Sequence, residues 1–442
     1  MKRIIEALNA DPRVSAYKIY MHLKESYELI IVKGKLETLR RTDTCDREVT
    51  VYVDHDSFRG DAQFFVYPST TDAQLSALIE EAVAKASQLE NQHYTLPAPE
   101  TGDFVVASNF ADYAPADLAS MVAQAVFGAN SIPNAALNAV EIFLNKHTET
   151  VRNSRGLEKR QQRYDAMVEA IPTYNGKAQS VERYEQYNFS TLDEAAIHRE
   201  IAEKREQVKA RYEAVTPGFP LEGPCVLHAQ ELGSLFGSIA RDLNYASVYS
   251  HTNLFKKGDT IQKALSGDPI SITMAGQAPG SIYSSKFDGD GMSLDSIELV
   301  KSGKVVNYYG SNRFGQYLGE APTGALPCCL VEPGSAKMPE GNWLDVLSMS
   351  GLQVDFYNDY IGGEVRLAHY HQGNEVKPVT GISISGKLSQ VLNQIRLSPE
   401  ITTQDGYHGP AAAILNDMKV FWSLLPHCSV RSAIHIIRLS HR

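Results

Sequence analysis

The segment Gly223-Pro-Cys-Val-Leu-His-Ala-Gln-Glu-Leu-Gly233 predicts a buried strand that runs directly into a helix, with His228 and Glu231 in the first helical turn. A zinc peptidase uses such a junction because a helix presents two histidines about one turn apart, with a glutamate beside the first acting as base. Here Ala229 follows His228, and Gly233 stands five residues after it. One imidazole cannot hold zinc, since a catalytic site needs about three protein ligands. We therefore predict that His228 is structural.

The chain divides into two halves just before this junction. Pro217-Gly-Phe-Pro220 separates them, so we predict an N-terminal region at 1–216 and a C-terminal domain at 217–442. Pro97, Pro99 and Gly102 indicate a further break near 97–114, which would give the N-terminal region two subdomains. The predicted class is α+β, with an N-terminal α/β half of mixed sheet and helices. The C-terminal half is predicted to be β-rich and barrel-like, and it carries the degenerate helix at His228.

Three helices are predicted in the N-terminal region, the first from its stripe of apolar residues and the other two from residues suited to a helix start. Thr71 and Gln74 form a capping box at the start of the first helix. The helices are expected at about 72–90, at about 115–127, and from a cap at Thr191 and Glu194 to before Pro217. Short strands are expected at 29–32 and 49–53, with the charged 40–47 region between them, and β structure is expected at 139–171, with turns at 145–147 and 153–156.

The C-terminal half is expected to hold a single helix, at 230–243, because glycine and proline punctuate the rest. Its strands are expected at 271–274, 296–300, 305–309, 364–371 and 378–385.

Charge and cysteine content limit the classes of function. The 442-residue chain has 42 basic and 52 acidic residues, a formal net charge of −10, which argues against direct binding to nucleic acid phosphates. Its five cysteines are irregularly spaced, so they predict a reducing compartment and no disulfide framework. The segment from Met1 to Asp11 is charged and lacks the apolar run of a signal peptide, and no apolar stretch approaches the roughly 18 residues that cross a bilayer. We therefore expect a soluble, cytoplasmic protein without membrane contact.

Other motifs are weaker candidates for metal or phosphate binding. His369-Tyr-His371 lies on a predicted strand, where residues i and i+2 share a face, so both imidazoles could reach one metal. We predict instead that they form a solvent-facing strand end before the turn at Gln372-Gly-Asn374. Asp288 and Asp290 lack the distal glutamate of a calcium loop, and Gly381 to Lys387 lacks the hydroxyl residue of a phosphate loop.

Further motifs are spread over most of the chain: Asn153-Ser-Arg-Gly-Leu157, the junction at His228, Phe287-Asp-Gly-Asp-Gly291, Thr323-Gly324, Gly351 to Gly363, and Val379-Thr-Gly-Ile-Ser-Ile-Ser-Gly386. In their order and spacing these motifs resemble the TldD/PmbA family. Members of this family were named as candidate modulators of DNA gyrase and behave as peptidases.

The resemblance implies which functional groups this chain lacks. In the catalytic, TldD-like branch the junction is HExxxH, and a cysteine in a glycine-rich stretch near the C-terminus completes the zinc site. Carried over by position, His228 matches the first histidine, Ala229 replaces the glutamate, and Gly233 replaces the second histidine. No cysteine lies between Pro399 and His408. This pattern resembles the PmbA (TldE) branch, the metal-free partner in a heterodimeric peptidase whose subunits enclose a chamber.

The sequence thus predicts a non-catalytic PmbA/TldE-like subunit that pairs with a TldD-like chain and helps to bind peptides or unfolded polypeptides. Zinc is expected in the catalytic partner and no cofactor in this chain, where His228 and Glu231 are the remnants of the site. Three alternatives stay open: an active metallopeptidase that recruits His228 with His369 and His371, a homodimeric peptide-binding protein, and a gyrase modulator.

Overall fold

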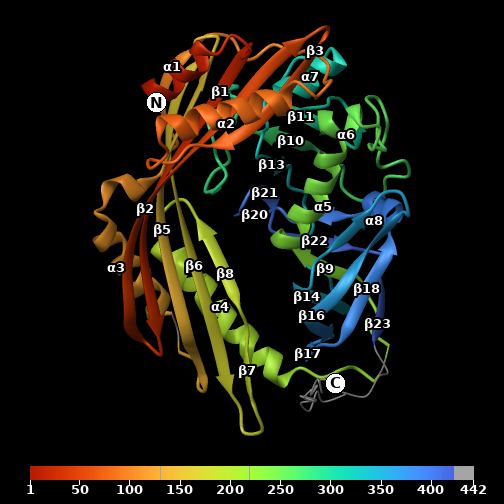
Figure 1. Cartoon of the computed structure of the whole chain (residues 1–442). Helices are drawn as coiled ribbons and strands as arrows, with labels where there is room; N and C mark the ends of the chain where they lie inside the picture. Colours follow the sequence, from red (N-terminus) through yellow and green to blue (C-terminus); the bar gives the residue numbers. More distant parts are fainter. Residues whose placement is uncertain (130, 219, 423–442) are drawn as a thin grey trace, which may run out of the picture.

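The computed structural model describes residues 1–129, 131–218 and 220–422. Figure 1 shows the N-terminal half on the left and the C-terminal half on the right. The strands of one sheet lie within residues 16–189, and those of two further sheets lie within 225–422. The boundary predicted at 216/217 falls between these two groups of strands. Strands on either side of the 97–114 segment share the first sheet.

An eight-stranded sheet forms the N-terminal half. Neighbouring strands run in the order β3 (Phe58–Phe65), β2 (Lys35–His55), β1 (Ala16–Val32), β5 (Ala135–Asn153), β6 (Glu158–Asn175) and β4 (Thr101–Val105), and β6 also pairs with β7 (Ser180–Glu182) and β8 (Glu185–Phe189).

The central strands are much longer than the short strands predicted from Ile and Val content. β1 has 17 residues and β2 has 21. The prediction that the charged 40–47 region lies between strands is wrong, because this region forms part of β2, with Arg40 opposite Glu28 and Arg47 opposite Met21. A ladder is held by backbone groups, so charged side chains on its exposed positions do not interrupt it.

The predicted turn at 145–147 is also wrong, because β5 continues through it. Asn145 donates a hydrogen bond to Asp165 on β6 at 2.7 Å, and His147 Nε2 lies 2.6 Å from the same carboxylate. These polar residues therefore stabilise the strand by cross-strand contacts. The predicted turn at 153–156 is confirmed, with Gly156 at φ +97°.

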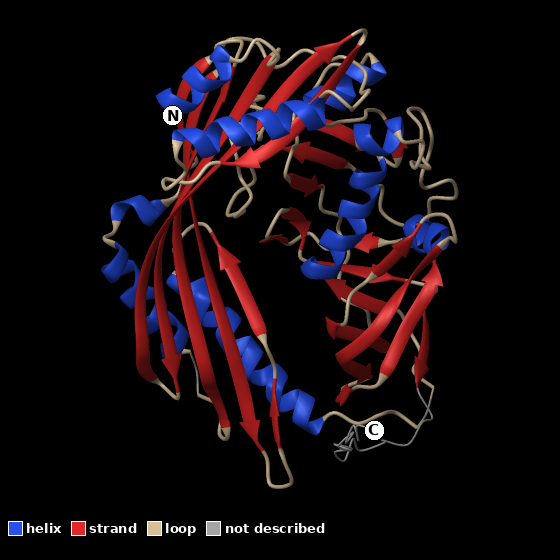
Figure 2. Cartoon of the chain, viewed as in Figure 1, coloured by secondary structure: helices blue, strands red, loops and turns tan. Residues whose placement is uncertain are grey.

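Helices cover one face of this sheet (Figure 2). α1 (Lys2–Ala10) and α2 (Asp72–Ala86) pack on one end of the strands, and α3 (Pro115–Gly128) and α4 (Glu194–Glu213) on the other. The capping box of Thr71 and Gln74 is confirmed. The cap predicted at Thr191 is wrong, since Asp193 accepts the hydrogen bond from the backbone N–H of Ala196. None of the helices described here combines the length and apolarity that crossing a lipid bilayer requires.

Two sheets form the C-terminal half. The six-stranded sheet runs β12 (Lys304–Val305), β11 (Ser296–Lys301), β10 (Ile272–Ala275), β13 (Cys328–Val331), β21 (Tyr407–Pro410), β20 (Ile401–Gln404). The nine-stranded sheet runs β19 (Arg396–Leu397), β22 (Ala412–Leu415), β9 (Cys225–His228), β14 (Asn342–Met349), β16 (Tyr360–Gln372), β18 (Ile382–Lys387), β23 (Lys419–Trp422), with β15 (Gln353–Asp355) and β17 (Glu375–Val379) also on β16. The predicted α+β class with a β-rich C-terminal half is confirmed.

Helix α5 (Ala229–Asp242) contacts strands of both C-terminal sheets, and its apolar side belongs to their shared core. The prediction of a single helix in this half is wrong. The short helices α6 (Tyr245–Tyr249), α7 (Asn312–Leu318) and α8 (Leu388–Gln394) have only 5 to 7 residues, too few for a periodic signal. The strand predicted at 378–385 is two strands, because the chain turns at Gly381, whose φ is +68°.

The two halves meet on the polar face of the first sheet. Lys18 on β1 forms an ion pair with Asp290 at 2.6 Å, and Lys159 on β6, which is fully buried, donates to Ser293 at 2.7 Å. Val151, Leu157 and Phe287 form a small apolar cluster beside them. These contacts place the loop at 276–294 against the sheet.

Candidate functional site

The junction of β9 and α5 forms as the sequence predicts. Cys225, Val226 and Leu227 are fully buried, and His228 is the N-cap residue of α5 rather than part of its first turn. Glu231 does lie in the first turn and is only 7% exposed. Burial raises the pKa of Glu231 above its ordinary value, because a low-dielectric environment disfavours the charged carboxylate.

The His228 side chain is held by an aspartate. Its Nε2 lies 2.7 Å from Oδ1 of Asp345 on β14, the strand next to β9. Burial lowers the pKa of His228, but the hydrogen bond and the charge of Asp345 outweigh that effect and hold the pKa above its ordinary value. The geometry therefore makes His228 one member of an ion pair that ties α5 to the nine-stranded sheet.

His369 and His371 lie on β16 beside this pair. In the register of β14 and β16, His369 is opposite Asp345 and His371 is opposite Trp343. The His371 ring stacks on Trp343 with centroids 3.8 Å apart, and its pKa is lowered mainly by burial. Across residues 1–422, apart from 130 and 219, no group of three or more His, Cys, Asp or Glu side chains is arranged to hold a metal ion.

A cleft of 660 Å³ runs along the side of α5 that faces the six-stranded sheet. Ala229, Gly233 and Gly237 line it from the helix at intervals of four residues, so they share one helix face. The turn at 404–407 and the side chains of Tyr283 and Tyr309 line the other walls. The structure thus brings positions 229 and 233 together with the 399–408 stretch, while His228 does not line the cleft.

Residues 221–421 match the family model described as the PmbA/TldA metallopeptidase C-terminal domain. The fold is similar to that of TldE from Thermococcus kodakarensis, with a TM-score of 0.76 at 15% identity, covering 95% of this chain and 99% of that one. The family-model match assigns residues 221–421 to the TldD/PmbA family.

Two other solved structures share the fold of this chain. Both are titled as candidate modulators of DNA gyrase. The one from Thermotoga maritima has a TM-score of 0.72 at 14% identity, covering 95% of this chain and 100% of that one. The one from Bacteroides thetaiotaomicron has a TM-score of 0.71 at 12% identity, covering 95% and 98%. No curated protein sequence matches the chain.

Tyr407 takes the space beside the position of the second family histidine. A Cβ atom added to Gly233 would lie 3.2 Å from Cβ of Tyr407, closer than most such contacts. The Tyr407 ring stacks nearly parallel to Phe236, with an interplanar angle of 4°. A histidine at 233 would therefore have to displace an aromatic side chain that is only 4% exposed.

The side chains of the cleft offer little acid–base or nucleophilic chemistry. Among the residues that the structure describes, its charged lining residues are Arg241 and Asp405, and no histidine lines it. Burial raises the pKa of the Cys329 thiol to about 12, so this lining cysteine is a protonated thiol rather than a thiolate nucleophile. His408 lies next to the cleft wall, but its Nδ1 is 2.8 Å from the hydroxyl of Thr403.

A second cavity of 240 Å³ adjoins the cleft, and the two share Tyr283 and Pro327. It is lined from the first sheet by Tyr20, Glu149, Gln161 and Arg163. Burial alone would raise the pKa of Glu149. The charge of Arg163, together with hydrogen bonds from Arg163, Gln161 and Tyr20, outweighs the effect of burial and holds this pKa below its ordinary value. Glu149 is therefore an ionised carboxylate at the junction of the two halves.

Sequence reasoning missed this polar face. The available signal is the alternation of polar residues at Asn145, His147 and Glu149, which has the period of a strand with one polar face. The interpretation of 145–147 as a turn concealed it.

Proposed function

We propose that this chain is a non-catalytic subunit of a TldD/PmbA-type zinc peptidase and that its α5 cleft holds an extended segment of a peptide. One observation carries the proposal. The cleft lies where the family pattern places the catalytic glutamate and the second histidine, yet Ala229, Gly233 and the neighbouring Tyr407 form its wall there. A binding surface is thus retained without the groups that would hold and activate a metal-bound water.

The dimensions and lining of the cleft support a peptide ligand. Its 660 Å³ lies within the range of about 300–1,000 Å³ that is usual for ligand sites. Small residues on α5 let a chain approach the helix closely, and Tyr283 and Tyr309 offer aromatic faces. Arg241, Asn244 and Gln404 supply hydrogen-bonding groups for a peptide backbone.

The decisive variant is Gly237→Leu. Apart from the backbone of its own helix and its chain neighbours, no described atom lies within 4 Å of a Cβ added at Gly237, so we expect the new side chain to enter the cleft without disturbing the fold. We expect it to weaken binding of a fluorescein-labelled unstructured peptide at least about tenfold, measured by anisotropy. Gly128→Leu is the matched control, because Gly128 is also helical with nothing within 4 Å and lies outside the cleft. Equal binding by both variants and the wild type would refute the peptide site.

The proposed partner is a TldD-like chain that supplies zinc, in the cytoplasm. Cys45, Cys225, Cys328 and Cys329 are free thiols, which suits a reducing compartment. Peptide cleavage by the purified chain alone, abolished by a chelator, would establish the active metallopeptidase instead.

A further inference from the structure

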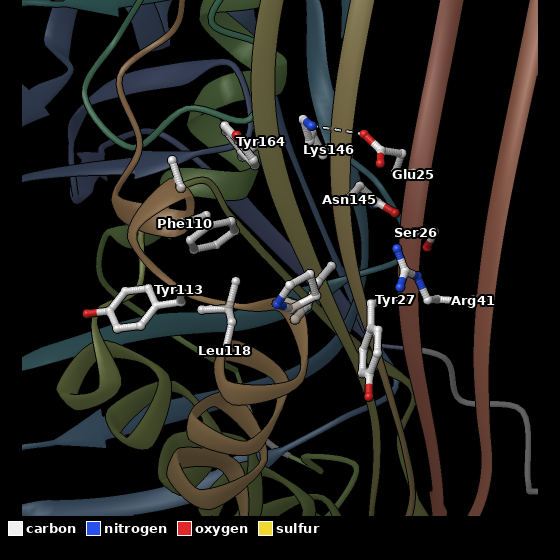
Figure 3. Close-up of a pocket in the computed structure, with 13 residues that line it drawn as sticks. Glu25, Ser26, Tyr27, Arg41, Phe110, Tyr113, Leu118, Asn145, Lys146 and Tyr164 are labelled. Carbon is white, nitrogen blue, oxygen red and sulfur yellow. Dashed lines mark ion pairs between the residues drawn. The ribbon is translucent and has the colours of Figure 1, made fainter.

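A separate pocket of 240 Å³ lies on the helix-covered face of the first sheet. It shares no lining residue with the α5 cleft or with the cavity at Glu149. Figure 3 shows Phe110, Tyr113 and Leu118 on one side of it and Tyr27 and Arg41 on the other. The first three belong to the short 3₁₀ helix η1 (Asn109–Asp112), the residue that follows it, and α3.

The register of the sheet sets the floor of this pocket. One row across the strands is Tyr164, Lys146 and Glu25, and the next is Leu144, Tyr27 and Arg41. Directly opposed residues project from the same face of a sheet, so all six lie on the side covered by α3.

The walls are apolar and aromatic. Phe110, Leu118 and Leu144 belong to the core and are 3 to 5% exposed, and Tyr27, Tyr113 and Tyr164 pack against that core. A cavity of about 150 Å³ lined by Leu, Ile and Phe is enough to bind benzene. At 240 Å³ this pocket has room for an aromatic or branched aliphatic side chain and a small polar group.

The charges at this pocket leave one cation without a partner. Its charged lining residues are Glu25, Arg41 and Lys146. Glu25 and Lys146 neutralise each other in an ion pair of 3.0 Å, drawn as a dashed line in Figure 3. Arg41 is exposed and forms no ion pair with any residue the structure describes. A guanidinium presents two parallel N–H donors, which match the two oxygens of a carboxylate.

We propose that this pocket binds a hydrophobic residue that carries a free α-carboxylate. The side chain lies between Phe110, Tyr113 and Leu118, and the carboxylate pairs with Arg41. Two sources share this chemistry: the C-terminal residue of a peptide and a free hydrophobic amino acid. The site is independent of the peptide-binding function proposed for the α5 cleft, because the two share no residue.

Isothermal titration calorimetry on the full chain tests the site with N-acetyl-L-phenylalanine as the probe. We expect saturable binding, and binding at least about tenfold weaker for N-acetyl-L-phenylalaninamide, which lacks the carboxylate. L-phenylalanine and a short peptide ending in phenylalanine distinguish the two sources. Failure of all three carboxylate probes to bind would overturn the proposal.

Two variants tie the binding to this pocket. Arg41→Gln removes the cation, and Ala111→Trp fills the pocket from an exposed lining position. Each is expected to weaken binding of N-acetyl-L-phenylalanine at least about tenfold. Arg47→Gln, on the same strand as Arg41 but outside the pocket, should leave the binding affinity unchanged. Unchanged affinity in Arg41→Gln and Ala111→Trp would place the ligand elsewhere and overturn the assignment. Thermal unfolding of each variant verifies that it is folded.

Discussion

At the scale of single residues, the contact of His228 with Asp345 gives the histidine at the strand–helix junction a charged partner. A raised pKa means that the folded state favours the protonated imidazole. The resulting stabilisation is present in full below the ordinary value of 6.5 and is lost as pH rises through the folded-state pKa.

We predict that Asp345→Asn lowers the free energy of unfolding by about 1 kcal/mol at a pH of about 5.5 and by less at a pH of about 9. The magnitude is modest because the His228 side chain is 39% exposed, and solvent screens the pair. Urea unfolding at both pH values is the measurement. In the His228→Gln background Asp345→Asn should no longer lower the free energy of unfolding, so the double-mutant cycle should give a coupling of about 1 kcal/mol at the lower pH. A coupling that grows with pH would be inconsistent with the pair.

A second prediction at the scale of single residues concerns zinc, because Ala229 and Gly233 stand where the family pattern has a glutamate and a histidine. The chain purified alone should hold far less than one zinc per molecule by elemental analysis after chelator dialysis. Ala229→Glu with Gly233→His should bind zinc only weakly, because Tyr407 crowds position 233 and a third ligand is missing. Stoichiometric zinc in the wild type that is lost in His228→Ala would refute the non-catalytic assignment.

Adding Gln404→Cys to that double variant should raise zinc affinity at least about tenfold, because Gln404 lines the cleft and cysteine is a soft ligand. Ile401→Cys is the matched control on the same strand, since Ile401 is 51% exposed and lies outside the cleft. Equal affinities from the two cysteine variants would show that the 404 side chain does not face the rebuilt site.

At the scale of elements, the packing of β3 against α2 depends on a glycine. A Cβ atom added at Gly60 would lie 1.7 Å from the carbonyl oxygen of Ala86, the last residue of α2. Backbone atoms would have to move, so we predict that Gly60→Ala lowers the free energy of unfolding by about 2–3 kcal/mol. Gly128→Ala, with open space around it, should change stability by less than about 1 kcal/mol. Denaturant unfolding of both variants is the measurement. Similar losses of free energy of unfolding for the two variants would contradict this packing.

At the scale of the whole molecule, the proposed non-catalytic subunit would contribute through an interface with its partner. We predict a stable complex with a TldD-like chain that buries more than about 2,000 Å² in total, as obligate interfaces do. Light scattering of the separate and mixed chains measures the molar mass and so detects the complex. A monomer that forms no complex on mixing would contradict the heterodimer, and a stable homodimer unaffected by the added chain would favour the homodimeric alternative.

Local sequence signals were sufficient where the structure depends on neighbouring residues. The capping box at Thr71, the strand–helix junction at His228 and the turn at Gly156 all follow from contacts within a few residues. The absence of the HExxxH side chains is likewise a property of the sequence alone, and the non-catalytic assignment that rests on it stays a prediction.

Only the tertiary structure decided the rest, because it depends on residues far apart in the chain. β2 continues through its charged segment because β1 provides a ladder partner, a pairing that local composition does not reveal. Tyr407 meets Gly233 across 174 positions of sequence only because β21 packs against α5. Arg41 joins Phe110 at one pocket for the same reason: register and helix packing, rather than sequence proximity, determine which side chains share a site.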